Sequence, residues 1–62
     1  MLNGPKLKAA REHARLTQEE LAKRCDVSRA HVVNVENGHS EPSLRLLGEL
    51  AKALKVKPGD LL

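Results

Sequence analysis

The sequence predicts an all-α fold, a compact bundle of four to five short helices. Three observations predict this class. Apolar residues recur at the three- and four-residue spacing of a helix, most clearly in one stripe formed by Leu44, Leu47, Leu50, Ala51 and Leu54. Glycine and proline occur at few places, and most of these separate helical segments. No segment alternates apolar and polar residues over a useful length, so no strand is predicted.

A first helix is expected just after the N-terminus. Asn3-Gly4-Pro5 suits its start, with Pro5 at the first helical position, where the missing N–H costs nothing. Apolar residues then recur at helical spacing while charged residues fill the other faces. These apolar residues are Leu7, Ala10 and Ala14.

A second helix begins at a capping box in segment 17–20, Thr-Gln-Glu-Glu. In such a box the Thr17 hydroxyl accepts from the Glu20 backbone N–H, and the Glu20 side chain reaches back to Thr17. This helix is expected to run through Cys25. Its inner side is expected to carry Leu21, Ala22 and Cys25.

A third helix is expected from Arg29 to about Asn37. Ser28 caps its start, and Gly38 stops it by adopting the left-handed conformation. Its inward residues are Val32 and Val35, which lie three apart.

A fourth helix follows the loop 39–42 and carries the leucine stripe. Ser43 caps this helix directly after Pro42. Pro58 then restarts a single terminal turn that ends in Leu61 and Leu62.

The link between the second and third helices is very short, since Cys25, Asp26 and Val27 lead directly to the Ser28 cap. Two helices joined by so tight a turn cross at roughly 90–120°, as in a helix-turn-helix motif. We place this motif at about residues 17–37. Its geometry pushes the third helix outward, so that one face is free to enter a groove. The residues on that outward face are Arg29, Ala30, His31, Val33 and Asn34.

The composition excludes several classes of function. A chain of 62 residues fits a single domain, 1–62, with little room for an active-site cleft beside its core. The absence of aromatic residues removes the stacking groups of single-strand and RNA readers. The one cysteine, Cys25, excludes an internal disulfide and a multi-cysteine zinc site, and no histidine has metal-ligand spacing. We therefore expect no metal, no cofactor and no enzymatic activity, since no nucleophile–base pair or glycine-rich phosphate loop is evident.

The charge and targeting signals indicate a cytoplasmic setting. Segment 1–15 is too densely charged for a signal peptide, and no apolar run approaches the ~20 residues that cross a bilayer. The formal net charge is +3, from 11 Lys and Arg against 8 Asp and Glu. This balance fits a polyanionic partner, although a lysine-rich solvated surface gives the same balance. No membrane contact or small-molecule substrate is expected.

Three groups of motifs occur in order along nearly the whole chain. They are Leu16-Thr17-Gln18-Glu19-Glu20-Leu21-Ala22, then Val27-Ser28-Arg29 leading to Val35-Glu36-Asn37-Gly38, and finally Pro42-Ser43-Leu44 followed by Leu50-Ala51-Lys52-Ala53-Leu54. In this combination the sequence resembles the repressor-type helix-turn-helix domains of the phage Cro/CI kind, the XRE family. The resemblance implies a lambda repressor-like DNA-binding domain.

The resemblance also implies three sets of functional residues. Those matching positions that read or approach base edges are Ser28, Arg29, Ala30, Val33 and Asn34. Those matching phosphate contacts are Gln18, His31, His39, Ser40, Ser43 and Arg45. Arg11 and Glu36 match a structural ion pair between the first and third helices. The chemistry agrees, because Arg pairs bidentately with guanine and Asn with adenine, while Ala30 and Val33 suit a thymine methyl.

The sequence departs from the family pattern in its turn and core. Asp26 stands where the family usually has glycine, so a left-handed residue with some strain is expected there. Cys25 replaces an aliphatic residue, and Ala10 and Gly48 stand where leucine is common. A thinner core is expected.

The expected function is that of a sequence-specific transcriptional regulator that binds double-stranded DNA. The resemblance implies a repressor that acts as a homodimer, with the third helix in the major groove and half-sites about 34–36 Å apart on a palindromic operator. A chain ending at Leu62 is expected to dimerise through its last two helices. A prokaryotic, phage or plasmid origin and association with the nucleoid are implied as well.

Two other functions stay open from the sequence. One is a protein-interaction module of the antitoxin or anti-repressor type. The other is a non-specific DNA-binding domain, which would not discriminate bases through Arg29 and Asn34. A specific reader loses ~1–3 kcal/mol for each good bidentate pair that is removed.

Overall fold

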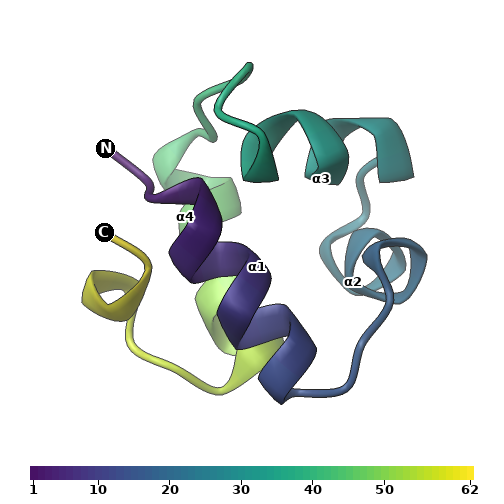
Figure 1. Cartoon of the computed structure of the whole chain (residues 1–62), viewed down its shortest axis with the longest axis horizontal. Coiled ribbons are helices and arrows are strands. Elements are labelled where there is room, and N and C mark those ends of the chain that lie inside the picture. The colour runs from purple at the N-terminus through teal and green to yellow at the C-terminus, as the bar shows by residue number, and fades with distance from the viewer.

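The computed structural model describes all 62 residues and contains four α-helices and one 3-10 helix (Figure 1). In chain order they are α1 (Gly4–His13), α2 (Gln18–Cys25), α3 (Arg29–Glu36), α4 (Leu44–Leu54) and η1 (Pro58–Leu61). There is no strand. The prediction of an all-α bundle of four to five short helices is therefore confirmed.

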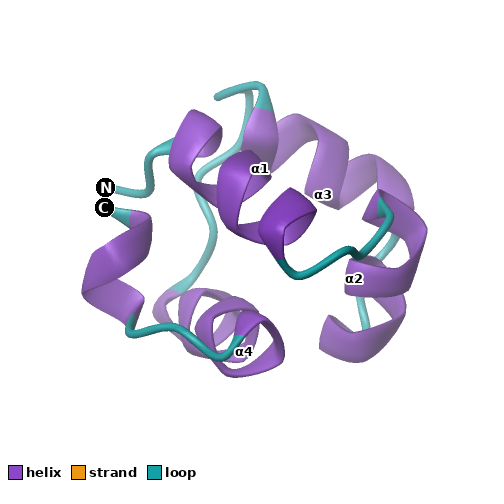
Figure 2. Cartoon of the chain, turned by 60° about the horizontal axis from the view of Figure 1, so that its bottom comes forward, coloured by secondary structure: helices purple, strands orange, loops and turns teal.

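The helices are arranged so that α2 and the chain ends lie at opposite ends of the molecule (Figures 1 and 2). The helix α1 packs against α3 and η1, while α4 packs against α2 and η1. The backbone N–H of Asn3 donates to the Leu61 carbonyl over 2.7 Å, which ties the two ends of the chain together. The helix α3 lies along one side of the bundle, with its start beside α2.

Each α-helix starts at a side-chain cap. The side-chain oxygens of Asn3, Thr17, Ser28 and Ser43 accept from the backbone N–H three residues later, over 3.0 to 3.1 Å. Thr17 also receives the reciprocal bond, because its N–H donates to the Glu20 carboxylate over 2.8 Å, which completes the predicted capping box. A cap of this kind contributes about 1 kcal/mol. The start of α1 differs from expectation by one residue, since the helix begins at Gly4 and Pro5 is its second residue.

The start of α1 lies against the end of α3. A Cβ atom on Gly4 would lie 2.2 Å from the carbonyl oxygen of Glu36 and 3.1 Å from that of Val35. No side chain fits in that space, because real Cβ atoms essentially never approach backbone closer than 3.0 Å. A glycine at position 4 therefore allows the backbones of α1 and α3 to approach closely.

The core contains eleven buried apolar residues contributed by all five helices. They are Leu7, Leu21, Ala22, Cys25, Val32, Val35, Leu46, Leu50, Ala51, Leu54 and Leu61. Two expectations about the inner faces were wrong. Leu44 is 88% exposed while Leu46 is buried, and Ala14 is exposed while Ala10 is half-buried.

The error at Leu44 has a physical cause. Residues 46, 50 and 54 recur every four positions, so they form a face as apolar as the predicted stripe. In the structure α2 and η1 cover that face of α4. Leu44, in the first turn of α4, stays in solvent, and Leu47 is half-buried. Ala14 follows the last residue of α1, where the chain turns toward α2.

Candidate nucleic-acid interface

The turn between α2 and α3 is closed by a left-handed aspartate. Asp26 has φ 57° and ψ 44°, so it adopts the conformation that glycine favours, as expected from its position. The N–H of Val27 donates to the carbonyl of Ala22 over 3.0 Å, which satisfies the end of α2. Two residues later α3 begins, so only a short link joins α2 to α3.

The third helix has one buried face and one open face. Val32, Val35 and Glu36 are buried against the rest of the molecule. The five residues predicted to approach bases lie on the other side or at the start of the helix. Ser28, Arg29, Ala30 and Asn34 are exposed, and Val33 is half-buried. Because the side chain of Ser28 accepts from the His31 N–H, its hydroxyl proton is left to donate to a ligand.

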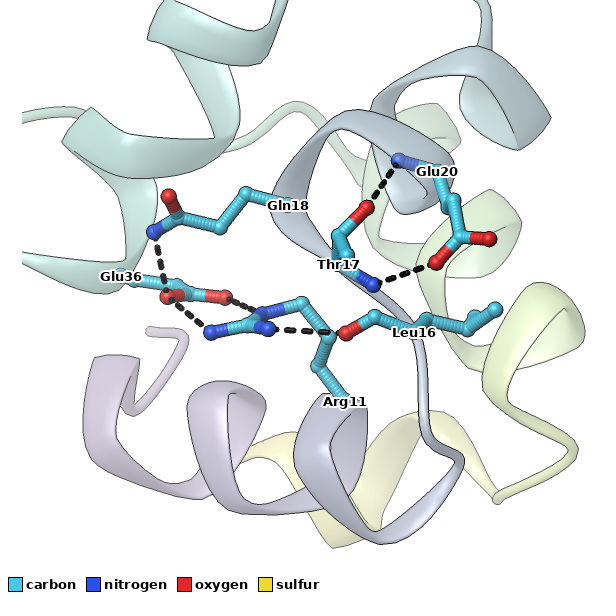
Figure 3. A network of polar contacts seen from close by, with 6 residues as sticks. All are labelled: Arg11, Leu16, Thr17, Gln18, Glu20 and Glu36. Atoms are coloured by element: carbon cyan, nitrogen blue, oxygen red, sulfur yellow. Dashed lines mark hydrogen bonds and ion pairs between the residues drawn. The ribbon is translucent and has the colours of Figure 1, made fainter.

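A buried ion pair joins α1 to the end of α3 (Figure 3). The Arg11 Nε donates to Glu36 Oε2 over 2.6 Å, and Nη2 donates to Oε1 over 3.3 Å. The third contact of Arg11, from Nη1, is to the Leu16 carbonyl over 2.8 Å. All charged atoms of the pair therefore have partners, as a buried pair requires. Removing one member of such a pair costs about 3–5 kcal/mol.

The same carboxylate holds Gln18, the predicted phosphate contact at the start of α2. Gln18 Nε2 donates to Glu36 Oε1 over 3.1 Å (Figure 3). A carboxylate only accepts hydrogen bonds, so this contact fixes which end of the Gln18 amide faces inward. One N–H of the amide is left for an outside acceptor. The free N–H groups of the first turn of α2 add to a favourable site for an anion.

The loop between α3 and α4 is anchored to the backbone at the end of α3. The backbone N–H groups of His39 and Ser40 both donate to the carbonyl of Asn34, over 2.8 and 3.3 Å. Gly38 has φ 79°, the left-handed conformation expected for it. The loop residues predicted to bind phosphate are thus held at a fixed place beside a residue predicted to read bases.

Three more phosphate candidates line one cavity of about 360 Å³ between the turn and the start of α4. These residues are His31, Ser43 and Arg45. The same cavity is also lined by Asp26, Glu41 and Glu49, whose carboxylates offset part of the positive charge. This acidic lining was not predicted from the sequence.

Cys25, which also lines this cavity, is buried. Burial raises the pKa of its thiol, and the nearby Glu49 carboxylate raises it further, so the thiol stays protonated at neutral pH. No group of three or more His, Cys, Asp or Glu side chains is placed to hold a metal ion. None of the helices has the length and apolar character that a membrane span requires.

Two further features of the site were missed in the sequence. The hydrogen bond from Gln18 to Glu36 joins residues 18 positions apart, and the carbonyl of Asn34 anchors the following loop. Both depend on how α2, α3 and the loop meet in space. The only sequence signal for the hydrogen bond from Gln18 to Glu36 was the expected pairing of Glu36 with Arg11.

A capped helix with one open polar face, carried outward by a tight turn from the helix before it, defines the class of helix-turn-helix DNA-binding domains. The helix-turn-helix family model matches residues 7–61 of this chain. The chain therefore belongs to this family, in its XRE or Cro/CI-type branch, whose members are DNA-binding transcription regulators rather than enzymes.

Named relatives support this assignment. The chain is 45% identical over 56 residues to an HTH-type transcriptional regulator of Methanocaldococcus jannaschii, covering 90% of this chain and 85% of that protein. It is 36% identical to the control protein C.BamHI of Bacillus amyloliquefaciens, over 100% of this chain and 78% of that protein. The structure superimposes on the P22 c2 repressor, crystallised with a synthetic operator, with a TM-score of 0.92 and 32% identity over 100% of this chain and 94% of that chain. The predicted resemblance and fold class are confirmed.

Proposed function

We propose that this protein represses transcription by binding a palindromic operator in double-stranded DNA as a homodimer, with α3 in the major groove. The observation that carries the proposal is the division of α3 into two faces. Val32, Val35 and Glu36 fix the helix to the bundle, while Arg29 and Asn34 are exposed on a rigid support. A major groove admits one α-helix, and a helix held this way presents its side chains in a fixed register.

The chemistry of the open face suits readout of base edges. The Arg29 guanidinium can donate two bonds to guanine O6 and N7, and the Asn34 amide can pair with adenine N6 and N7. Ala30 and Val33 offer methyl groups to a thymine methyl, and Ser28 has a free hydroxyl proton. Each half-site is therefore expected to combine a guanine, an adenine and at least one thymine.

The phosphate contacts surround α3 on two sides. Gln18 would grip the backbone beside the start of α2, while the second group would grip it beside α4. That second group consists of His31, His39, Ser40, Ser43 and Arg45. Contacts on both sides fix the depth and register of α3 without reading sequence.

The homodimer follows from the symmetry of such operators. Two copies related by a two-fold axis would place their α3 helices about 34–36 Å apart, one turn of DNA. The C-terminal helices α4 and η1 are proposed to carry the contact between the two copies. Repression would then follow from occupancy of a promoter, controlled by the concentration of the protein, with no cofactor or metal, in the cytoplasm.

The test compares two variants on a selected operator and on random DNA. The Gln18→Ala change is expected to weaken binding about equally on both DNAs. The Arg29→Ala change is expected to remove ~1–3 kcal/mol of the preference for the operator. The matched control is Arg24→Ala, which removes the same charge. Arg24 is an exposed residue of α2 that lies near Lys52 and Glu49. Equal losses on both DNAs for Arg29→Ala would refute its role in base readout.

A further inference from the structure

Two of the six residues that are proposed to contact phosphate are histidines. His31 is the third residue of α3, and His39 lies in the loop that follows this helix. The other four proposed contacts are Gln18, Ser40, Ser43 and Arg45. Among the six, only Arg45 keeps a positive charge at every physiological pH, because a guanidinium does not lose its proton there. The charge that this surface presents to DNA therefore depends on the protonation of the two imidazoles.

His31 is half-buried in the wall of the cavity between the turn and the start of α4. Two more proposed phosphate contacts, Ser43 and Arg45, line the same cavity of about 360 Å³. A phosphate held by Ser43 and Arg45 would therefore lie near the His31 imidazole. The backbone N–H of His31 is used by the Ser28 cap, which fixes the residue in the first turn of α3 and leaves the ring to meet a ligand.

Charges of both signs surround the His31 imidazole. They come from the turn, the loop and α4, and they are Asp26, Glu41, Glu49 and Arg45. The three carboxylates favour the imidazolium, while the arginine and the positive end of α3 favour the neutral ring. These effects oppose one another in the free protein, whereas an added phosphate favours the imidazolium only. The Cys25 thiol of α2 also lines the cavity, but burial raises its pKa, so it carries no charge near neutral pH.

His39 is exposed, and its backbone N–H donates to the carbonyl of Asn34 over 2.8 Å. This bond fixes the place of the residue but leaves its ring in solvent. Glu41 lies two positions further along the same loop. The two ion pairs of the chain involve other residues, so neither imidazole has an ionic partner in the free protein. A DNA phosphate would be the first ionic partner of either ring.

We infer that binding to the operator takes up protons at His31 and His39, so that the affinity for DNA rises as the pH falls through the range in which imidazoles titrate. This inference rests on the proposed function and adds a regulation of the same site. A phosphate oxygen stabilises an imidazolium and raises the pKa of the ring in the complex, so the bound protein holds more protons than the free protein. A lower pH therefore favours the complex.

The size of the effect follows from a modest change in each ring. A phosphate that raises the pKa of an ordinary imidazole by about one unit makes binding about 5-fold tighter at pH 6 than at pH 8. A dimer contains two copies of each histidine, so the operator should be bound at least ~100-fold more tightly at pH 6.

The dependence on salt should change together with the affinity. At about pH 8, Arg45 is the only charged phosphate contact in each copy, and log K should fall against log salt with a slope of about −2. At about pH 6, His31 and His39 add four cations to the dimer, and the slope should steepen to about −5. A change in both quantities is expected only if the protons are taken up where phosphate binds.

The test measures the affinity for a selected operator and for random DNA at both pH values and at several salt concentrations. The variant carries His31→Gln and His39→Gln, because glutamine keeps an N–H donor but has no charge at either pH. It is expected to lose the dependence on pH and to keep the shallow salt slope throughout. His39→Gln alone, at an exposed residue, should lose about half of the dependence on a logarithmic scale and does not put the fold at risk.

The matched control is His13→Gln, the same change at the last residue of α1, which is exposed and lies outside the proposed contacts. It should keep the full dependence on pH. A dependence that persists in the double variant would come from another group, such as the α-amino group, and would overturn the inference. The inference also fails if the wild type prefers the operator equally well and equally tightly at both pH values. If the wild type shows no preference for the operator at either pH, the proposed function itself fails.

Discussion

Two glycines lie in α-helices of this chain, and the structure predicts opposite effects when each is replaced by alanine. A Cβ on Gly4 would lie 2.2 Å from the carbonyl oxygen of Glu36, which is backbone and cannot rotate away. A Cβ on Gly48 would meet no atom within 4 Å. The same substitution therefore tests close packing at one site and helix propensity at the other.

The magnitudes follow from these distances. Overpacking a close contact costs about 1–3 kcal/mol, so Gly4→Ala is expected to lower the free energy of unfolding by about that amount. Gly48→Ala removes a glycine from the interior of α4 and is expected to raise it by about 1 kcal/mol. For a domain of this size each kcal/mol shifts the thermal midpoint by about 4–8 °C. The midpoint should fall by about 4–24 °C for Gly4→Ala and rise by about 4–8 °C for Gly48→Ala.

The assay is thermal unfolding followed by circular dichroism, with denaturant titration to obtain the free energies. The two variants should lie on opposite sides of the wild type. A Gly4→Ala variant as stable as Gly48→Ala would mean that α1 and α3 do not approach each other as closely as described, and the account of this contact would be wrong.

Three further predictions follow from the ion pair, the capping box and the charge of the DNA-facing surface. Glu36→Gln should lower the free energy of unfolding by about 3–5 kcal/mol, because it leaves Arg11 buried without its counter-charge, and denaturant titration with no measurable loss would contradict this. The Thr17 N–H and hydroxyl lower the pKa of Glu20 below 4.5, so its contribution to stability is present above pH 4.5 and is lost as the pH falls through the folded-state value. Acid titration of the wild type against Glu20→Gln should therefore show a steeper loss for the wild type, and identical curves would argue against the capping box. Arg45 is the one arginine among the proposed phosphate contacts, since Arg29 is assigned to a base edge. A dimer therefore neutralises about two phosphates at about pH 8, and log K should fall against log salt with a slope of about −2, whereas a slope steeper than about −4 would mean that other cations bind DNA.

The parts of the fold that were predicted depend on residues close together in the sequence. The caps at Thr17, Ser28 and Ser43 each join a side chain to the N–H three residues later, and this spacing is visible in the chain itself. Gly38 and Asp26 adopt left-handed conformations that their residue types and positions indicated. In all these places, local chemistry is sufficient to predict the backbone structure from the sequence.

The parts that were missed depend on contacts between distant segments. Leu44 and Leu46 both fit a helical apolar pattern, and only the positions of α2 and η1 decide which one is buried. Gly4 has no local reason to be glycine, since its role comes from the carbonyl of Glu36, 32 positions away. The acidic lining near His31 likewise results from the approach of α4 to the turn.

In the proposed function, α3 reads a defined sequence as part of a two-fold pair. It is tested most directly by selecting bound duplexes from a random pool at about 0.15 M salt, where non-specific phosphate contacts are weak. A palindrome with half-sites about one helical turn apart, each containing guanine, adenine and thymine, should be enriched. A pool that stays random, with binding that disappears as the salt concentration rises, would contradict it.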